Sequence, residues 1–119
     1  MNTMWEQRFL DLANNISLWS KDRSTKVGAV IITENKEPVS FGYNGFPPGV
    51  SEDKDERHDR PTKYLYTTHA ELNAILQADR TRLIGSTIFV THFPCADCAR
   101  SIIKSGISQV IYNKDNGPI

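Results

Sequence analysis

The chain has 119 residues, 39% hydrophobic and 24% charged, a composition typical of a globular domain rather than a disordered segment. Its 14 basic and 14 acidic residues cancel, whereas proteins that bind a phosphate backbone normally carry a basic excess. No apolar run approaches the ~20 residues that span a membrane, and the N-terminal segment carries charges where a signal peptide is apolar. We therefore predict a single cytoplasmic domain over residues 1–119 that binds neither nucleic acid nor a membrane.

Apolar residues at helical spacing predict an amphipathic helix over residues 4–19. The β-branched run 26–33 and the segment 39–44 read as two strands, and the turn residues 34–38 between them predict a hairpin. Glycine, proline and a dense run of charges then predict a loop over 45–63.

Two helices and two strands alternate in the second half of the chain. The predicted elements are a helix over 69–78 with Thr67 or Thr68 as N-cap, a strand over 86–93, a helix over 95–105 ended by Gly106, and a strand over 108–113. This order predicts an α/β fold, in which a mixed sheet has helices on its faces and the last two strands are parallel.

Cys95 and Cys98 have Cys-x-x-Cys spacing at the first turn of a predicted helix. Positions i and i+3 share one face of a helix, so both sulfurs can reach one metal ion. The helix N-terminus also favours the thiolate, which is the form that binds metal. The spacing alone fits zinc ligation, a redox dithiol or coincidence.

His69 opens the preceding helix, two residues before Glu71. Taken alone, His69 fits a packed histidine and Glu71 a solvated acid near the helix dipole. Both helices begin at one predicted sheet edge, however, where α/β proteins bind their ligands. His92 lacks a ligand spacing and His58 lies in the charged loop, so the inventory favours an open site of one histidine and two cysteines. Catalytic zinc sites keep such an open position for water.

The motif "HAE" followed by "PCADC" resembles the His-x-Glu and Pro-Cys-x-x-Cys signature of the zinc-dependent cytidine and deoxycytidylate deaminase family. Four segments extend this likeness from about Leu18 to Tyr112 and are most similar to the dCMP deaminases of the family: "STKVGAVI", "FGYNGFPPGV", "HAELNAIL" and "VTHFPCADCARSIIKSGI". The resemblance implies a three-layer α-β-α fold with a mixed central sheet of four to five strands.

The resemblance also implies an activity, namely hydrolytic deamination of dCMP to dUMP and ammonia, which supplies dUMP for thymidylate synthesis. His69, Cys95 and Cys98 would hold one Zn²⁺ per subunit, with water as the fourth ligand. Glu71 would transfer protons from that water to the cytosine ring and the leaving amino group.

Further residues match family positions that contact ligands. Asn44 would contact the sugar and base, and the backbone of Ala70 and Phe93 would read the cytosine edge. The segment 22–26 would receive the 5′-phosphate, although an ordinary turn before a strand explains it equally well. The phosphate-binding residues expected there are Arg23, Ser24, Thr25 and Lys26.

Family members are typically homohexamers regulated by dCTP and dTTP, which here would bind near Gly45, Phe46 and Pro47, with Mg²⁺ accompanying the effector. The chain reads Phe-Pro-Pro-Gly where relatives often read Phe-Pro-Arg-Gly, which removes an arginine from that region. Relatives usually continue through one more helix and strand, so the sequence is either a compact version or lacks that tail, and the resemblance then implies that a neighbouring subunit closes the pocket.

Two alternative functions remain open. One is another deaminase of the superfamily, acting on free cytidine or on adenosine in tRNA. The other is a non-catalytic zinc or redox module that uses only the cysteine pair.

Overall fold

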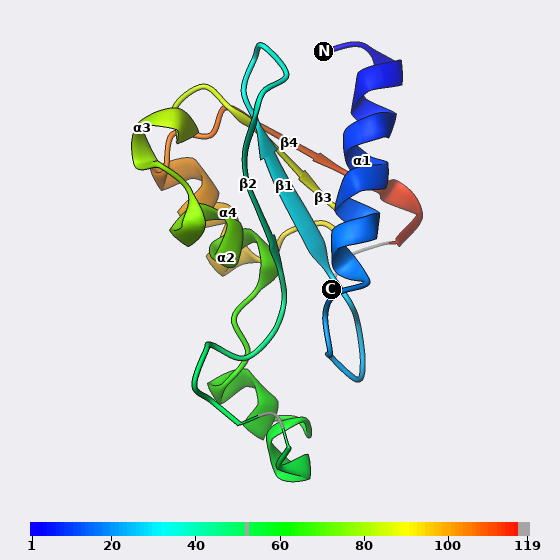
Figure 1. The fold of residues 1–119 in the computed structure, drawn as a ribbon, viewed down its shortest axis with the longest axis vertical. Coiled ribbons are helices and arrows are strands. Elements are labelled where there is room, and N and C mark those ends of the chain that lie inside the picture. The colour runs from blue at the N-terminus through cyan, green and yellow to red at the C-terminus, as the bar shows by residue number, and fades with distance from the viewer. Residues whose placement is uncertain (52, 117–119) are drawn as a thin grey trace.

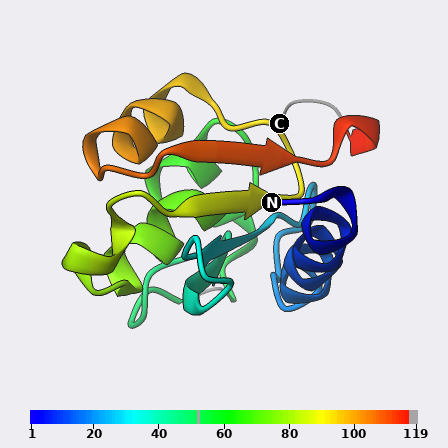
Figure 2. The same ribbon diagram turned by 90° about the horizontal axis from the view of Figure 1, so that it is seen from above.

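The computed structural model describes residues 1–51 and 53–116, and one sheet organises them (Figures 1 and 2). The four strands lie in the order β2-β1-β3-β4, and their bounds are Gly28–Ile32 for β1, Pro38–Tyr43 for β2, Thr87–Val90 for β3 and Gln109–Tyr112 for β4. β1 pairs antiparallel with both β2 and β3, whereas β3 and β4 are parallel. The predicted mixed sheet, its hairpin and its parallel pair are confirmed.

Helices cover both faces of this sheet, as the view from above shows (Figure 2). α1 (Thr3–Ser17) packs on one face, while α2 (Ala70–Gln77) and α4 (Ala96–Lys104) pack on the other. Alternate residues of the fully buried strand β1 enter two separate cores. Val30 and Ile32 face α1, and Ala29 and Ile31 face the other pair of helices. The predicted three-layer arrangement is therefore present.

The strand register brings the ends of all four strands to one edge of the sheet. Gly28 at the start of β1 is opposite Tyr43 at the end of β2, and Val90 at the end of β3 is opposite Tyr112 at the end of β4. α2 and α4 both begin at this edge, as was expected from the sequence (Figure 1). The edge is therefore the place where groups from distant parts of the chain meet.

Residues 45–51 and 53–66 lie beyond this edge as an extension, at the bottom of Figure 1. The sequence predicted a loop here, and the structure adds two 3-10 turns, η1 (Asp55–Arg57) and η2 (Thr62–Leu65). A backbone bridge between Gly45 and Thr68 joins the two ends of the extension, with N···O distances of 3.1 and 2.8 Å.

The prediction that Thr67 or Thr68 caps α2 is wrong. Thr68 is engaged in the bridge to Gly45, so His69 takes the N-cap position with an extended backbone (φ −70°, ψ 154°). Its ring makes no capping hydrogen bond to the helix. The predicted end of α4 is correct, because Gly106 follows that helix at φ +90°, a conformation that glycine adopts without strain.

A short helix that the sequence did not predict, α3 (Arg80–Leu83), follows α2, with the Asp79 side chain accepting a hydrogen bond from the Thr81 N–H. Within the described residues, no helix has both the length and the apolar character needed to cross a membrane.

Candidate active site

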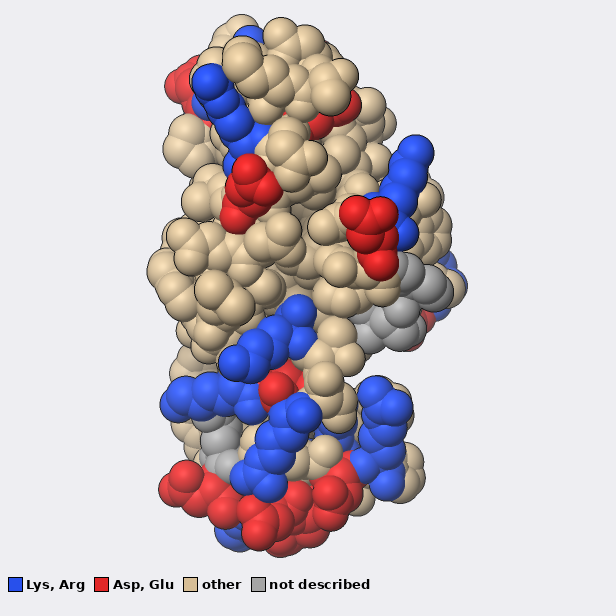
Figure 3. Space-filling model, turned by 90° about the vertical axis from the view of Figure 1, so that its right-hand side faces the viewer, with Lys and Arg blue, Asp and Glu red and all other residues tan. Residues whose placement is uncertain are grey.

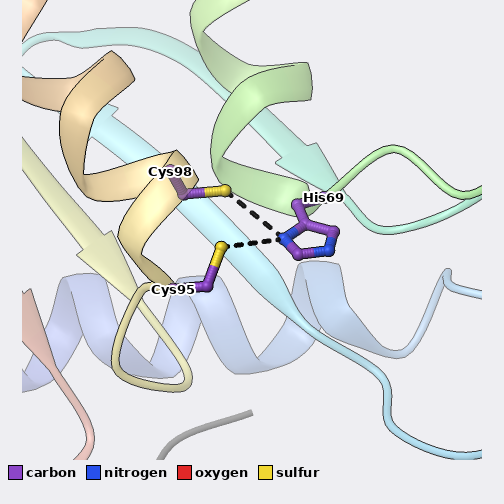
Figure 4. A group of neighbouring side chains, drawn as sticks. All are labelled: His69, Cys95 and Cys98. Atoms are coloured by element: carbon purple, nitrogen blue, oxygen red, sulfur yellow. Dashed lines mark hydrogen bonds between the residues drawn. The ribbon is translucent and has the colours of Figure 1, made fainter. Parts of the chain in front are cut away.

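His69, Cys95 and Cys98 lie together at the sheet edge (Figure 4). His69 Nδ1 is 3.5 Å from the Sγ of Cys95 and 3.4 Å from the Sγ of Cys98, and all three ligand atoms lie within 4.8 Å of one another. Tetrahedral Zn²⁺, with bonds of about 2.3 Å to sulfur and about 2.0 Å to nitrogen, holds such atoms roughly 3.5 Å apart. The donor set and its spacing therefore fit zinc.

The local fold explains why these side chains meet. His69 and Cys95 are the N-cap residues of α2 and α4, and neither side chain caps its own helix. Both side chains are consequently available to point across the gap between the two helix N-termini. Cys98 lies one turn into α4 on the same face as Cys95.

A close contact between β2 and α2 fixes the first turn of α2. A Cβ atom at Gly42 would lie 2.4 Å from the Ala70 carbonyl oxygen and 2.5 Å from the Ala74 nitrogen. Only glycine permits this approach of strand and helix backbones. Gly42 therefore helps to set the position of His69, immediately before the helix.

Glu71 is completely buried, in the first turn of α2. Neither carboxylate oxygen has a hydrogen-bond partner among the described residues that meets ordinary geometry. Burial raises the pKa of Glu71, and its own backbone N–H, His69 and Cys98 offset only part of that rise. A buried carboxyl group with a raised pKa and no hydrogen-bond partner, next to potential metal ligands, is typical of a functional site. Glu71 is therefore a candidate proton-transfer group whose partner would be a bound ligand.

The two cysteines have no disulfide between them. Burial, followed by the nearby charges of Glu71 and Cys95, raises the pKa of the Cys98 thiol above its ordinary value. A bound cation opposes these effects, because it stabilises the thiolate directly. The cluster is thus arranged for a metal ion rather than for a free reactive thiol.

A cavity of about 440 Å³ opens beside the cluster, within the range typical of small-molecule sites. Its lining combines His69 and Cys95 of the cluster with side chains from the loop before β1 and from the extension. The lining residues are Asp22, Thr25, Val27, Asn44, Arg60, Lys63, Tyr64, Thr67, His69, Ala70, Glu71, Cys95 and Asp97.

Asn44 and Ala70, two of the predicted substrate contacts, line this cavity. The side chain of Asn44 is also structural, because its Oδ1 accepts from the Val27 N–H (2.9 Å) and its Nδ2 donates to the Thr25 carbonyl (2.9 Å). Phe93 is outside the lining; the residue is 49% exposed, and its ring packs edge-on against Tyr112.

Only one of the four predicted phosphate-binding residues lines the cavity. Thr25 lines the cavity, whereas Arg23, Ser24 and Lys26 are exposed outside the lining. Arg23 forms an exposed ion pair with Asp55 of the extension, with an N···O distance of 3.0 Å.

The cations that line the cavity are Arg60 and Lys63, which the sequence analysis missed. Both follow the acidic run of the extension, where lysine and arginine are ordinarily solvated. The signal that was available is the "RPTKY" segment shortly before His69, where two basic residues stand three positions apart and a tyrosine follows the second. Thr67 was missed as well, and its buried hydroxyl lacks a hydrogen-bond partner among the described residues.

The predicted effector residues Gly45, Phe46 and Pro47 line a second cavity of about 470 Å³. Trp19, Tyr43 and Gln77 contribute to its walls.

The remaining histidines stay outside the metal cluster. His92 contacts the Thr91 hydroxyl through Nδ1 (2.8 Å), and burial lowers the pKa of His92. His58 stacks on Phe46 with a ring-centroid distance of 5.0 Å, so it is not simply solvated.

Comparisons with known proteins identify a family of zinc-binding deaminases. Residues 3–114 match the family model of the cytidine and deoxycytidylate deaminase zinc-binding region. An uncharacterized deaminase in the luxG 3′ region of Aliivibrio fischeri is 53% identical over 110 residues, which are 92% of this chain and 73% of that protein. A probable deoxycytidylate deaminase of Caenorhabditis elegans is 45% identical over 114 residues, which are 92% of this chain and only 58% of that protein.

A solved structure resembles the whole described fold. The dCMP deaminase of cyanophage S-TIM5 in apo form superposes with a TM-score of 0.78 at 28% identity, covering 95% of this chain and 85% of that one. The same phage enzyme has been solved in complex with dCMP and dUMP, and that structure gives a TM-score of 0.77. With nearly its full length matched, the chain belongs to the cytidine and deoxycytidylate deaminase family of zinc-binding proteins.

Proposed function

We propose that this chain is a zinc-dependent hydrolase that deaminates dCMP to dUMP and ammonia, and so supplies dUMP for thymidylate synthesis. The observation that carries the proposal is the cluster of His69, Cys95 and Cys98 beside the buried, unpartnered carboxyl group of Glu71. His69, Glu71 and Cys95 border a cavity large enough for a mononucleotide, and Cys98 lines an adjoining pocket that shares His69.

The proposal assigns the metal to His69 Nδ1 and to the sulfurs of Cys95 and Cys98. Zinc bound there supplies a hydroxide nucleophile at neutral pH, because it lowers the pKa of water to about 7. Glu71 is not a ligand in this assignment. Burial raises the pKa of Glu71, which suits its carboxyl group to accept a proton from the attacking water, to deliver that proton to the ring nitrogen N3, and to carry the water's remaining proton to the amino group that leaves as ammonia.

The choice of dCMP within the family is supported by the named relatives. The C. elegans relative and the S-TIM5 structures carry the name deoxycytidylate or dCMP deaminase, and the S-TIM5 enzyme has been solved with both dCMP and dUMP. Binding of the cytosine edge by the backbone of Ala70 and of the sugar near Asn44 is part of the same proposal.

Other features are carried only by the family resemblance. They are regulation by dCTP and dTTP near Gly45, Phe46 and Pro47, an accompanying Mg²⁺ and a homohexameric assembly. A single-domain organisation and a cytoplasmic location remain predictions from the length and composition of the sequence.

A substrate panel tests the proposed function. We expect the zinc-loaded protein to convert dCMP faster than CMP, dCTP, deoxycytidine or single-stranded DNA, with the loss of cytosine absorbance as the measurement. Preferential turnover of free cytidine, or of tRNA adenosine in a parallel assay, would assign the chain to another branch of the family. Protein that holds zinc and turns over none of these compounds would support the non-catalytic alternative.

A further inference from the structure

A buried ion pair joins two distant segments at the wall of the cavity. Lys63 Nζ, from the extension, is 3.0 Å from Asp22 Oδ1, in the loop before β1. The two side chains are only 9% and 6% exposed, and both residues line the cavity. Burying a lysine costs free energy unless its charge is compensated. Lys63 is therefore not an ordinary solvated surface lysine, and its burial in the cavity wall indicates a specific role.

The carboxylate of Asp22 accepts three hydrogen bonds. Its Oδ1 accepts hydrogen bonds from the backbone N–H groups of Ser24 (2.8 Å) and Thr25 (3.0 Å) in addition to Lys63. The carboxylate therefore has three donors, and it holds Lys63 in one place. The ammonium group of Lys63 has three N–H donors, and in the described part of the chain Asp22 is its hydrogen-bond acceptor. Donors remain for a ligand in the cavity.

The charges around the cavity also favour an anion at this end. Arg60 lines the wall with Lys63, three residues away on the extension. Figure 3 shows lysine and arginine side chains gathered where the extension joins the body, while aspartate and glutamate gather at its far end. Of the other carboxylates in the lining, Asp97 pairs with Arg100, and Glu71 interacts with His69 and Cys98 of the cluster.

We propose that Lys63, positioned by Asp22 and accompanied by Arg60, binds the 5′-phosphate of the mononucleotide and selects it over the nucleoside. This inference rests on the proposed function for the pyrimidine end of the ligand, which places cytosine at Glu71. It moves the phosphate site from Arg23, Ser24 and Lys26, whose side chains are exposed outside the lining, to the buried lysine in the wall.

The test compares dCMP with deoxycytidine in the native protein and in Lys63→Met. Loss of a charge-assisted hydrogen bond costs about 10- to 100-fold. We expect kcat/KM for dCMP to fall by about that factor. Turnover of deoxycytidine should stay within about threefold, since the nucleoside makes no phosphate contact. Lys104→Met, an exposed lysine in the last turn of α4, is the matched control.

A second arm measures binding alone, through the thermal shift given by dUMP and by deoxyuridine. We expect dUMP to stabilise the native protein more than deoxyuridine does, and Lys63→Met to remove the difference. This arm gives a result even if the chain deaminates neither substrate, so failure of the proposed function and failure of the phosphate assignment are distinguishable. The double variant Asp22→Asn/Lys63→Met repeats both arms without an unpaired buried carboxylate, in case Lys63→Met folds poorly.

Two outcomes would overturn the inference. One is an equal loss for dCMP and deoxycytidine in both Lys63 variants, which would mean that the ion pair is only structural. The other is an unchanged preference in the Lys63 variants together with a lost preference in Lys26→Met, which would return the phosphate to the segment before β1.

Discussion

At the scale of single residues, burial distinguishes the charged groups to which we assign a role from those exposed to solvent at the surface. Glu71 is fully buried without a partner, and the ion pair of Asp22 and Lys63 is buried with its charges matched. Arg23 pairs with Asp55 in the open, where an ion pair contributes little. The two buried sites lie on the wall of one cavity, which is why the proposed chemistry and the proposed phosphate contact share a ligand.

Asp22→Asn isolates the charge of the buried pair, because the amide oxygen can still accept from the Ser24 and Thr25 N–H groups. Lys63 would lose its counter-ion, and we expect about 3 kcal/mol of destabilisation at neutral pH. Denaturant unfolding measures this loss. The double variant Asp22→Asn/Lys63→Met should recover a good part of it, and a double variant less stable than Asp22→Asn would contradict the assignment.

The same pair gives a pH dependence with a definite sign. Burial raises the pKa of Asp22, but the Thr25 and Ser24 N–H groups and Lys63 outweigh burial and hold it below the ordinary value of 3.8. The ionised carboxylate therefore contributes stability above pH 3.8, and this contribution is lost as the pH falls through the lower folded pKa. Asp22→Asn should accordingly show a shallower loss of melting temperature on acidification in that window.

At the scale of elements, the site depends on how closely β2 approaches α2. Gly42→Ala would place a methyl group against the backbone of α2, at Ala70 and Ala74, and neither backbone can rotate away as a side chain could. We expect a destabilisation of about 1–3 kcal/mol. We also expect weaker zinc binding, because His69 directly precedes the displaced turn.

Competition with a zinc chelator, together with thermal unfolding, measures both effects of Gly42→Ala. Gly45→Ala is the matched control, since a Cβ there meets nothing within 4 Å. Equal zinc affinity in the two variants would show that the contact at Gly42 does not position the metal ligands.

The ends of helices illustrate what the sequence could and could not predict. The termination of α4 at Gly106 follows from a local preference, the left-handed backbone of glycine, and was predictable. The start of α2 was misassigned, because threonine is a good N-cap in isolation. Thr68 is instead paired with Gly45 across the base of the extension, and no local pattern reports a pairing between residues so far apart in sequence.

At the scale of the whole molecule, the metal cluster was predictable from the sequence, whereas the ion pair in the cavity wall was not. Alternating apolar residues and turn signals predict the sheet and its two helical faces, and the ligands carry a recognisable spacing of their own. Lys63 and Asp22, by contrast, are 41 positions apart and meet only because the extension folds back onto the loop before β1. Their sequence context, charged and loop-like, is that of solvated residues.

The most direct test of the central claim pairs metal content with turnover in the native protein and in Glu71→Gln. The glutamine has nearly the same shape but cannot transfer the proton, and Glu71 is not one of the three proposed ligands. We predict about one zinc per chain in both proteins, conversion of dCMP to equal amounts of dUMP and ammonia by the native protein, and a loss of at least about 100-fold in kcat for the variant. Native-like turnover by a zinc-loaded Glu71→Gln protein would contradict the account.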